Sequence, residues 1–432
     1  MTTFNRIFVL VRQYFLLFLD WFCQTFLGRR LIPLTEESLL KKFPPEDRRL
    51  LLSETLTRRW WYEGFTILLK CFREDETCTL AGRQVIETRW TEILRNRLAI
   101  SKRLASVDLT KCPITKPIFI IGSARTGSTY LQALLNQDPR NTSPYYYEVM
   151  CPVIEGSTSK LGHEDLRTRT YERQLASVYR NLPSLKAAHN INLQGPYECF
   201  RLLDNTGIFK SYFVFTRNNS GYLDWVLART KDEMAEMYQL HKKQLQLIFL
   251  SRDSDSTPEN SRVILKDSLH SVYLEAILDA YPDAVFIHTY RDPVAVMASS
   301  CSVVEAFRES YGYGSTAIDR KALGKELLYF PWGHGGKEIL KFRKDHPEEE
   351  HRFIDIAYAE LVASPMDIVK RIYGHFGLNL TNHGRERMKR YVQENPQNKH
   401  GRHKYDLSKY GLTKDEVYEH FKEYIQYFNI QC

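Results

Sequence analysis

Hydrophobic and polar positions follow one another along most of this chain in a pattern that predicts alternating strands and helices. Short apolar runs rich in β-branched and aromatic residues lie at 118–121, 262–266, 284–290 and 352–357, and each is typical of a buried strand. After the first run, apolar residues recur at helical spacing through Leu131, Leu134 and Leu135. The alternation predicts an α/β fold with a central parallel sheet flanked by helices, whose ligands bind at the carboxyl ends of the strands.

The pattern differs before residue 117. Residues 7–28 are mostly apolar, but Arg6, Gln13, Asp20 and Gln24 fall within one narrow sector of a helix. We expect residues 1–31 to form a helix that lies on a membrane, inserts into it or packs on the protein itself, with membrane association favoured. Residues 32–110 are charged and helical in pattern and predict a helical extension packed on the domain at 111–432.

Composition excludes few classes of protein. The net charge of +8 is modest for 432 residues, which favours an enzyme of anionic ligands over a dedicated nucleic-acid binder. The eight cysteines form no C-x-x-C pair, so their spacing does not predict a zinc site. Membrane association, at the cytoplasmic face or in the Golgi, is favoured over a soluble cytoplasmic location.

The loop after the first strand has the spacing of a phosphate-binding loop. It reads G-S-A-R-T-G-S-T from Gly122, with Ser128 at the position where an ATP-binding loop carries lysine. The cation is instead Arg125, inside the loop, which suits a nucleotide without a γ-phosphate. Candidate phosphate-binding residues are Arg125, Thr126, Gly127, Ser128 and Thr129, together with the positive end of the following helix.

A second candidate motif follows the strand at 284–290. Arg291 stands at the strand end, and Ser299 lies two helical turns further on. An arginine and a hydroxyl at this spacing could hold a second phosphate. Taken alone, the motif is better explained by an arginine that pairs with a neighbouring carboxylate such as Asp292, with Ser299 as an ordinary helix residue.

The two motifs together resemble the sulfotransferases that use 3′-phosphoadenosine 5′-phosphosulfate (PAPS). The similarity is strongest to the bacterial-type branch, which carries R-T-G-T-T in the loop and R-D-P-V after the later strand; this chain has R-T-G-S-T from Arg125 and R-D-P-V from Arg291. The resemblance extends from about residue 80 to the C-terminus. It implies a P-loop-like catalytic domain that binds the 5′-phosphosulfate at the loop and the 3′-phosphate at Arg291 and Ser299. It also implies that Arg402 and Lys404, in a basic segment near the C-terminus, contact the 3′-phosphate.

Sulfuryl transfer needs cations near the sulfonate and a general base for the acceptor hydroxyl. Lys266, at the end of the second strand, is expected to stabilise the transferring group beside Arg125. By resemblance to other branches of the family, Glu148 is the first candidate for the base, His270 the second and Glu198 the third. No metal is expected.

The acceptor is the part that the residues specify least. Tyr145, Tyr146, Tyr147, Tyr212, Phe213 and Phe215 form an aromatic set that suits a lipid, sterol or phenol, while an apolar N-terminal helix also fits a glycan-modifying enzyme. Two other interpretations stay open. A P-loop small-molecule kinase requires an acidic strand end for Mg²⁺, and an inactive membrane scaffold requires loss of the binding residues.

Overall fold

A five-stranded parallel sheet forms the centre of the molecule, with strand order β2-β5-β1-β6-β7. The computed structural model describes residues 15, 18–28, 30–154, 160–161, 164–181, 191–210, 220–252, 261–310, 318–329, 336–396 and 406–432. The strands are β1 (Ile118–Ile121), β2 (Asn141–Thr142), β5 (Arg262–Lys266), β6 (Val285–Tyr290) and β7 (Phe353–Ala357). The predicted α/β fold is confirmed. Strand β2 was not predicted, because a strand of two residues is too short to show a periodic pattern.

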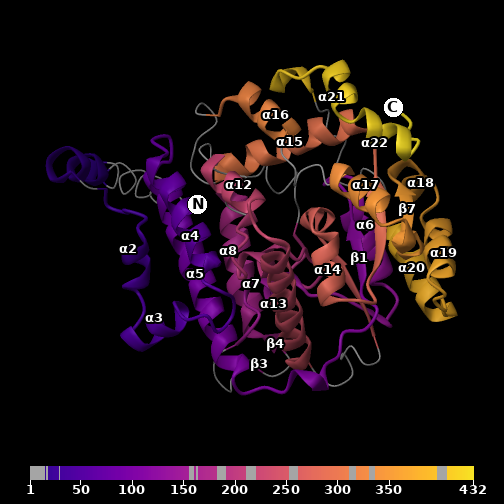
Figure 1. Cartoon of the computed structure of the whole chain (residues 1–432), viewed down its shortest axis with the longest axis horizontal. Coiled ribbons are helices and arrows are strands. Elements are labelled where there is room, and N and C mark those ends of the chain that lie inside the picture. Colours follow the sequence, from indigo (N-terminus) through magenta and orange to yellow (C-terminus); the bar gives the residue numbers. More distant parts are fainter. Residues whose placement is uncertain are drawn as a thin grey trace.

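Side chains alternate between the two faces of the sheet, so each strand contributes to two cores. Ile118 and Ile120 pack in a core with residues of four helices: α6 (Ser128–Leu135), α18 (Tyr358–Ala363), α19 (Pro365–His375) and α20 (Asn382–Glu394). Phe119 and Ile121 join the larger core on the other face. That face is covered by α13 (Lys231–Leu250), α14 (Leu274–Ala280), α17 (Gly336–Asp345) and α22 (Lys422–Tyr427). In Figure 1, α19 and α20 flank β7 at one side of the molecule, and α4 and α5 lie at the other.

The region before β1 is helical, as predicted, and shares the larger core. Its helices are α2 (Glu36–Leu40), α3 (Pro45–Leu51), α4 (Trp60–Glu74) and α5 (Leu80–Leu104). Arg97 of α5 is only 2% exposed, stacks 3.8 Å over the Trp61 ring and donates to the backbone oxygen of Asn205. The helical extension is therefore packed on the strand-bearing part of the chain through both apolar and hydrogen-bonded contacts.

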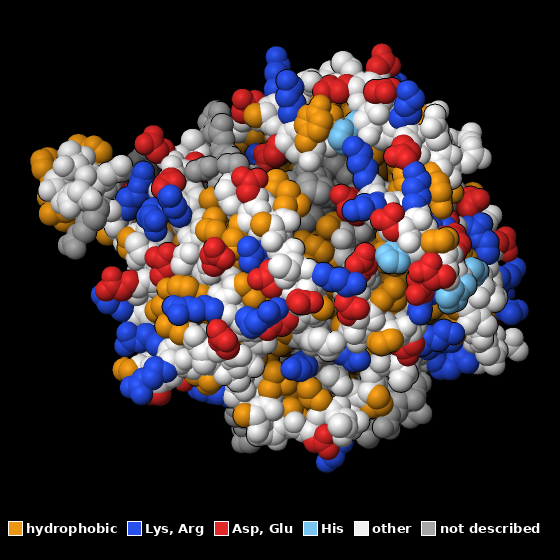
Figure 2. All heavy atoms as spheres, viewed as in Figure 1, with side chains coloured by type: hydrophobic (Ala, Val, Ile, Leu, Met, Phe, Trp, Pro, Cys, Tyr) orange, Lys and Arg blue, Asp and Glu red, His pale blue; other side chains and the backbone are white. Residues whose placement is uncertain are grey.

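The helical residues 18–27 project from the body of the molecule (Figure 1). Asp20, one of the polar positions of the sequence pattern, faces inward and accepts a hydrogen bond from the Leu31 backbone at 3.1 Å. The outward face carries Phe18, Trp21 and Phe26, each more than half exposed. This helix forms the apolar knob at the left edge of Figure 2. Among the helices that the structure describes, none is long and apolar enough to cross a membrane.

The remaining elements connect and cap these layers. They are η1 (Leu109–Lys111), α7 (Tyr146–Met150), the β3 (Lys160–Leu161) and β4 (Glu164–Asp165) pair, α8 (Leu166–Asn181), α10 (Phe200–Asp204), α12 (Ser220–Leu227), η4 (Ser268–Val272), α15 (Pro293–Ser310), α16 (Arg320–Tyr329), η7 (Pro347–Arg352), η8 (Ser408–Tyr410) and α21 (Lys414–His420). In Figure 1, α15, α16 and α21 lie together above the sheet.

Candidate active site

The register of the sheet brings three predicted residues to one edge. Ile120 of β1 pairs with Lys266 of β5, and Ile121 pairs with His288 of β6. Because the strands are parallel, the residues that follow their carboxyl ends emerge together. Gly122, Lys266 and Arg291 therefore lie at the same edge of the sheet.

The loop between β1 and α6 has a backbone conformation that requires glycine at its first position. Gly122 has φ +117°, and a Cβ added there would lie 2.2 Å from the backbone oxygen of Thr289. Its N–H donates to the Ser271 hydroxyl at 2.8 Å. Gly127 has φ +85° and caps the start of α6. The close approach of the loop to β6 therefore depends on the missing side chain at residue 122.

Arg125 also has a left-handed backbone, with φ +68°. This conformation is uncommon for a residue with a side chain, and it is found most often where a functional geometry is imposed. Thr126 beside it is buried and donates its hydroxyl to the Ser123 carbonyl at 2.8 Å, so that hydroxyl serves the loop itself. Ser128 is half-buried and Thr129 is exposed at the start of α6. The loop thus offers one guanidinium, two hydroxyls and a helix N-terminus to an anion.

The two motifs that the sequence placed far apart are in direct contact. Nε of Arg125 donates to the hydroxyl of Ser299 at 2.9 Å, and Arg291 donates to the backbone oxygen of Arg125 at 3.3 Å. Ser299 is 1% exposed on α15. Asp292 accepts from the backbone of Val294 at 2.9 Å. Among the described residues, no carboxylate forms an ion pair with Arg125 or Arg291.

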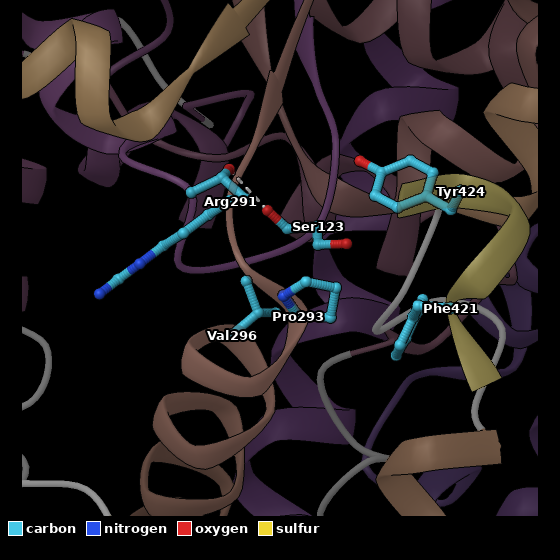
Figure 3. A pocket seen from close by; sticks show the side chains of 7 residues that line it. Ser123, Arg291, Pro293, Val296, Phe421 and Tyr424 are labelled. Atoms are coloured by element: carbon cyan, nitrogen blue, oxygen red, sulfur yellow. Dashed lines mark hydrogen bonds between the residues drawn. The ribbon is translucent and has the colours of Figure 1, made fainter. Parts of the chain in front are cut away.

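A small hollow borders this contact. Its lining comes from the loop, from the first turn of α15 and from the C-terminal residues Phe421 and Tyr424. Figure 3 shows the Arg291 side chain extending away from Pro293 and Val296, while the two aromatic rings close the opposite side. The Arg291 guanidinium lies 4.2 Å from the centre of the Tyr358 ring. This cation–π contact orients the arginine and leaves its charge unneutralised.

Lys266 is buried to 3% exposure at the end of β5. Its Nζ donates to the Thr129 hydroxyl at 2.9 Å and forms an ion pair with Glu198. The Glu198 side chain is 26% exposed, so this carboxylate borders solvent while the lysine does not. The lysine, the start of α6 and a carboxylate thus form one hydrogen-bonded group at the sheet edge.

Glu148, the first candidate for the base, has both carboxylate oxygens engaged within the protein. One accepts from the Tyr145 backbone at 2.7 Å as part of a capping box, and the other accepts from Nε of Arg252 at 2.8 Å. Arg252 also donates to Thr142 of β2 at 2.7 Å. Glu148 is 1% exposed. Its contacts connect α7 to β2 and to the end of α13.

His270, the second candidate, lies in the core. It is fully buried, packs edge-on against Phe119 at 5.0 Å between ring centres, and shares a 2.8 Å hydrogen bond between Nδ1 and the Tyr238 hydroxyl. Burial, with the nearby charge of Lys210, lowers the pKa of His270 to about 3. A base with so low a pKa takes up a proton poorly at neutral pH.

Other predicted residues fall in different places. Arg402, Lys404, Tyr212, Phe213 and Phe215 lie outside the described residues. Tyr146 packs edge-on against Tyr197 at 4.7 Å and is 4% exposed, so it belongs to the core, while Tyr145 and Tyr147 are half-buried. Sequence reasoning missed Ser271, Thr289 and Tyr358, which shape the loop and hold Arg291. Of these, only Thr289 could have been noticed in the sequence, because it lies at the end of β6.

The geometry corresponds to a known class of enzymes. A P-loop-like turn without the ATP-binding lysine, in contact with a second arginine–serine motif on an α/β sheet, is the arrangement that the sequence predicts for a transferase. The family model described as "Sulfotransferase family" matches residues 117–382. The chain therefore belongs to the sulfotransferase family and is an enzyme that transfers a sulfuryl group.

Relatives and solved structures agree with this assignment. The "Omega-hydroxy-beta-dihydromenaquinone-9 sulfotransferase Stf3" of Mycobacterium bovis is 26% identical over 323 residues, which are 72% of this chain and 74% of that protein. Sulfotransferase STF1 from Mycobacterium tuberculosis superposes with a TM-score of 0.72 at 25% identity, covering 91% of this chain and 100% of that one. STF9 from Mycobacterium avium has the same fold, with a TM-score of 0.76 at 24% identity over 92% and 97% of the two chains. The predicted family and bacterial-type similarity are confirmed.

Proposed function

We propose that the donor of the sulfuryl group is 3′-phosphoadenosine 5′-phosphosulfate, bound with its phosphosulfate at the loop after β1 and its 3′-phosphate at Arg291 and Ser299. The observation that supports this proposal is the 2.9 Å contact between Arg125 and Ser299, which brings the two candidate anion-binding motifs together. Two arginines that form no ion pair within the described part of the chain suit a ligand with two separate anionic groups. Arg402 and Lys404 are proposed as further contacts to the 3′-phosphate.

Transfer would proceed by in-line displacement. The acceptor oxygen forms a bond to sulfur as its proton passes to a carboxylate, and the bond from sulfur to the oxygen of the 5′-phosphate breaks. The products are a sulfate ester and 3′-phosphoadenosine 5′-phosphate. Lys266 and Arg125 would stabilise the negative charge that develops on the departing oxygen. Thr129 and Ser128 would hold the sulfonate through their hydroxyls.

We assign the general base to Glu198, ahead of Glu148 and His270. Of the three candidates, Glu198 is the one whose side chain is partly open to solvent, since Glu148 and His270 are buried. It also contacts the proposed catalytic Lys266 directly. When the donor binds, Lys266 would turn toward the leaving oxygen, and the Glu198 carboxylate would then accept the proton of the acceptor hydroxyl. Glu148 then has a positioning role through Arg252.

The acceptor that we propose is a hydroxyl of an apolar lipid. The relative from Mycobacterium bovis is named for a hydroxylated dihydromenaquinone, which is a lipid alcohol. The exposed aromatic side chains of helix 18–27 supply a surface that would rest at the membrane interface, where such an acceptor resides. A phenol, sterol or glycan acceptor is the competing outcome.

Calorimetry with 3′-phosphoadenosine 5′-phosphate tests the donor. The full chain should bind this product and discriminate against ATP, and Arg291→Ala should weaken binding by about 10–100-fold because one charge-assisted contact is worth about 1.5–3 kcal/mol. Lys370→Ala, which removes an exposed cation on α19, is the matched control and should leave affinity unchanged. ATP binding as tight as that of the bisphosphate would instead favour the kinase interpretation, and no effect of Arg291→Ala would refute the assigned 3′-site.

Cosedimentation with vesicles of anionic and zwitterionic lipid tests the membrane contact. The full chain should pellet with vesicles, while a chain lacking residues 1–30 should stay in the supernatant. Trp21→Asp together with Phe26→Asp, on the exposed face of the helix, should have the same effect without altering the core. An unchanged distribution would refute the membrane contact while leaving the donor assignment intact.

A further inference from the structure

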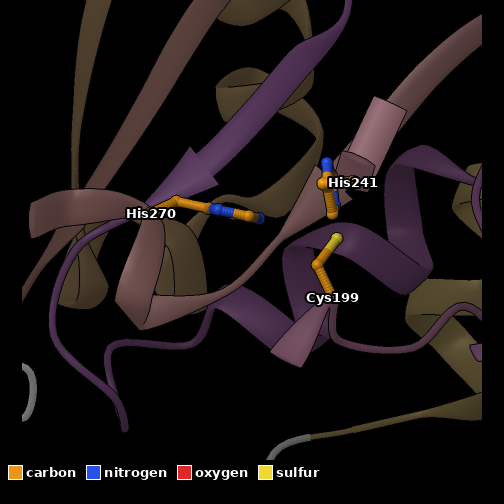
Figure 4. A group of neighbouring side chains, drawn as sticks. All are labelled: Cys199, His241 and His270. Atoms are coloured by element: carbon orange, nitrogen blue, oxygen red, sulfur yellow. The ribbon is translucent and has the colours of Figure 1, made fainter. Parts of the chain in front are cut away.

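Three buried side chains behind the candidate active site form a cluster that the reaction does not use. They are Cys199, immediately before α10, His241 of α13 and His270 of η4. The sulfur of Cys199 and one ring nitrogen of each histidine all lie within 4.8 Å of one another, and all three residues are buried. Figure 4 shows the His270 ring pointing toward His241, with the Cys199 sulfur turned to the space between them.

The two imidazole rings are held in place from their outer sides. Nδ1 of His241 lies 2.9 Å from the Tyr281 hydroxyl, and Nδ1 of His270 lies 2.8 Å from the Tyr238 hydroxyl. The Nε2 atoms of both histidines are buried, and neither has a hydrogen-bond partner among the described residues. Buried polar atoms are nearly always paired, so two unpaired nitrogens beside one thiol call for an explanation.

We propose that this cluster binds one Zn²⁺ ion through Sγ of Cys199 and Nε2 of His241 and His270. Zinc accepts both thiolate and imidazole ligands, and three protein ligands leave its fourth position to a water or another small ligand. Ligating histidines usually donate their second ring nitrogen to a hydrogen-bond acceptor, which is the arrangement that Tyr238 and Tyr281 supply here. Binding displaces the thiol proton, which passes to solvent.

The spacing of the three atoms is close to what zinc requires. Ligand bonds of about 2.0–2.3 Å in a tetrahedron place neighbouring ligand atoms roughly 3.4–3.7 Å apart. The three atoms lie within 4.8 Å of one another, so zinc binding requires the distances between them to shorten by about 1 Å. Small rotations of the side chains are enough for this. The sequence pattern could not indicate such a site because its ligands lie 42 and 29 residues apart (241 − 199 and 270 − 241) on three separate segments.

The site would act as a cross-link and would not touch substrate. The Cys199 backbone N–H donates to the Lys266 carbonyl at 3.1 Å, and the preceding residue is Glu198. A metal at the cluster would therefore fix the segment carrying Glu198 to η4 and to α13, directly behind the Glu198–Lys266 pair. This proposal does not rest on the identity of the sulfuryl donor, since metal binding is measured without it.

Metal analysis of the full chain, folded and dialysed after incubation with Zn²⁺, tests the site. One zinc per chain is expected, and a hundredfold excess of Zn²⁺ over its dissociation constant should raise Tm by about 3 °C. Co²⁺ in place of Zn²⁺ should give a near-ultraviolet thiolate-to-cobalt charge-transfer band. Cys199→Ser should abolish the band and weaken binding by more than about 100-fold. Cys301→Ser, at a buried cysteine on α15, is the matched control and should change neither readout.

A folded native chain that retains no zinc, or a cobalt complex without the thiolate band, would overturn the proposal. Retention of metal by Cys199→Ser, or its loss from Cys301→Ser, would overturn it equally. If Cys199→Ser does not fold, Tyr281→Phe removes only the outer partner of His241 and should weaken zinc binding by about 10-fold. Unchanged affinity in that variant, together with an absent band in the native chain, would refute the site.

Discussion

Replacing Glu198 by glutamine is expected to stop sulfuryl transfer while leaving the fold in place. The amide oxygen of glutamine can still accept a hydrogen bond from Lys266, but it cannot take the acceptor proton. The Lys266 side chain is only 4% exposed, so glutamine at residue 198 also leaves a buried cation without its counter-charge and should lower the free energy of unfolding by up to about 3–5 kcal/mol. Loss of a general base lowers kcat by about 10²–10⁴-fold.

The same substitution at Glu148 should lower stability in a similar way but have little effect on kcat. Glu148 is 1% exposed and is paired with Arg252, whose side chain is 10% exposed. Glutamine there leaves a buried guanidinium without a counter-charge, which costs up to about 3–5 kcal/mol and lowers Tm by several degrees. The folded fraction of Glu148→Gln should retain most of its kcat.

The assay pairs three measurements on both variants. Release of 3′-phosphoadenosine 5′-phosphate, with saturating donor and a hydroxylated menaquinone-type lipid, gives kcat. Calorimetry with the same product gives nucleotide affinity, which should be unchanged in Glu198→Gln, and thermal unfolding gives Tm.

A Glu198→Gln variant with kcat within about threefold of the native value would refute its role as the base, because even a weak general base contributes about 10²-fold. If Glu148→Gln instead loses activity at unchanged Tm, the base is Glu148 and its pairing with Arg252 must open during the reaction.

Three further predictions concern the loop, the lysine and acid stability. Gly122→Ala should abolish nucleotide binding, measured by calorimetry, because its Cβ would lie 2.2 Å from the Thr289 carbonyl oxygen. The control is Gly374→Ala on α19, where the space around the glycine is open. Thermal unfolding should show that this variant is unchanged in stability or more stable by up to about 1 kcal/mol. Lys266→Met should lower kcat by about 10²–10³-fold, as loss of one charge-stabilising donor does, with a smaller effect on product affinity; retention of full kcat would exclude the lysine from the reaction. Burial alone would raise the pKa of Asp138, but hydrogen bonds from Arg140 and Tyr373 and the charge of Arg262 hold that pKa below its ordinary value. The stability that this carboxylate contributes is therefore fully present above its unfolded pKa and is lost as the pH falls through its folded pKa. The difference in free energy of unfolding between the native chain and Asp138→Asn should accordingly be constant above about pH 5 and shrink below about pH 4.

The strands and the glycine-bounded loop after β1 could be predicted because their signals are local. A run such as Ile118–Ile121 is apolar over its whole length, and burial on both faces of a parallel sheet requires that composition. The glycines at 122 and 127 follow from the backbone turn that the loop makes, with φ +117° and +85°. The spacing of Arg291 and Ser299 could be recognised for the same reason. Arg291 directly follows the end of β6, and Ser299 lies on α15, the next helix.

The candidate base could not be chosen from the sequence. Glu148, Glu198 and His270 are all plausible proton acceptors when only residue type and spacing are known. Their difference lies in the environment: a paired and buried carboxylate, a carboxylate at the solvent edge beside Lys266, and an imidazole enclosed by aromatic rings. Each environment is made by residues distant in the chain, so it exists only in the folded molecule.

The fold class, the candidate anion-binding loop and the second arginine motif could be predicted from the sequence alone, because each depends on residues that are neighbours along the chain or at most two helical turns apart. The tertiary structure decided which of these groups meet. It brought Arg125 to Ser299, set Glu198 against Lys266, and gathered Cys199, His241 and His270 into one cluster. These contacts depend on how strands and helices pack, and packing is a property of the whole core that no local pattern carries.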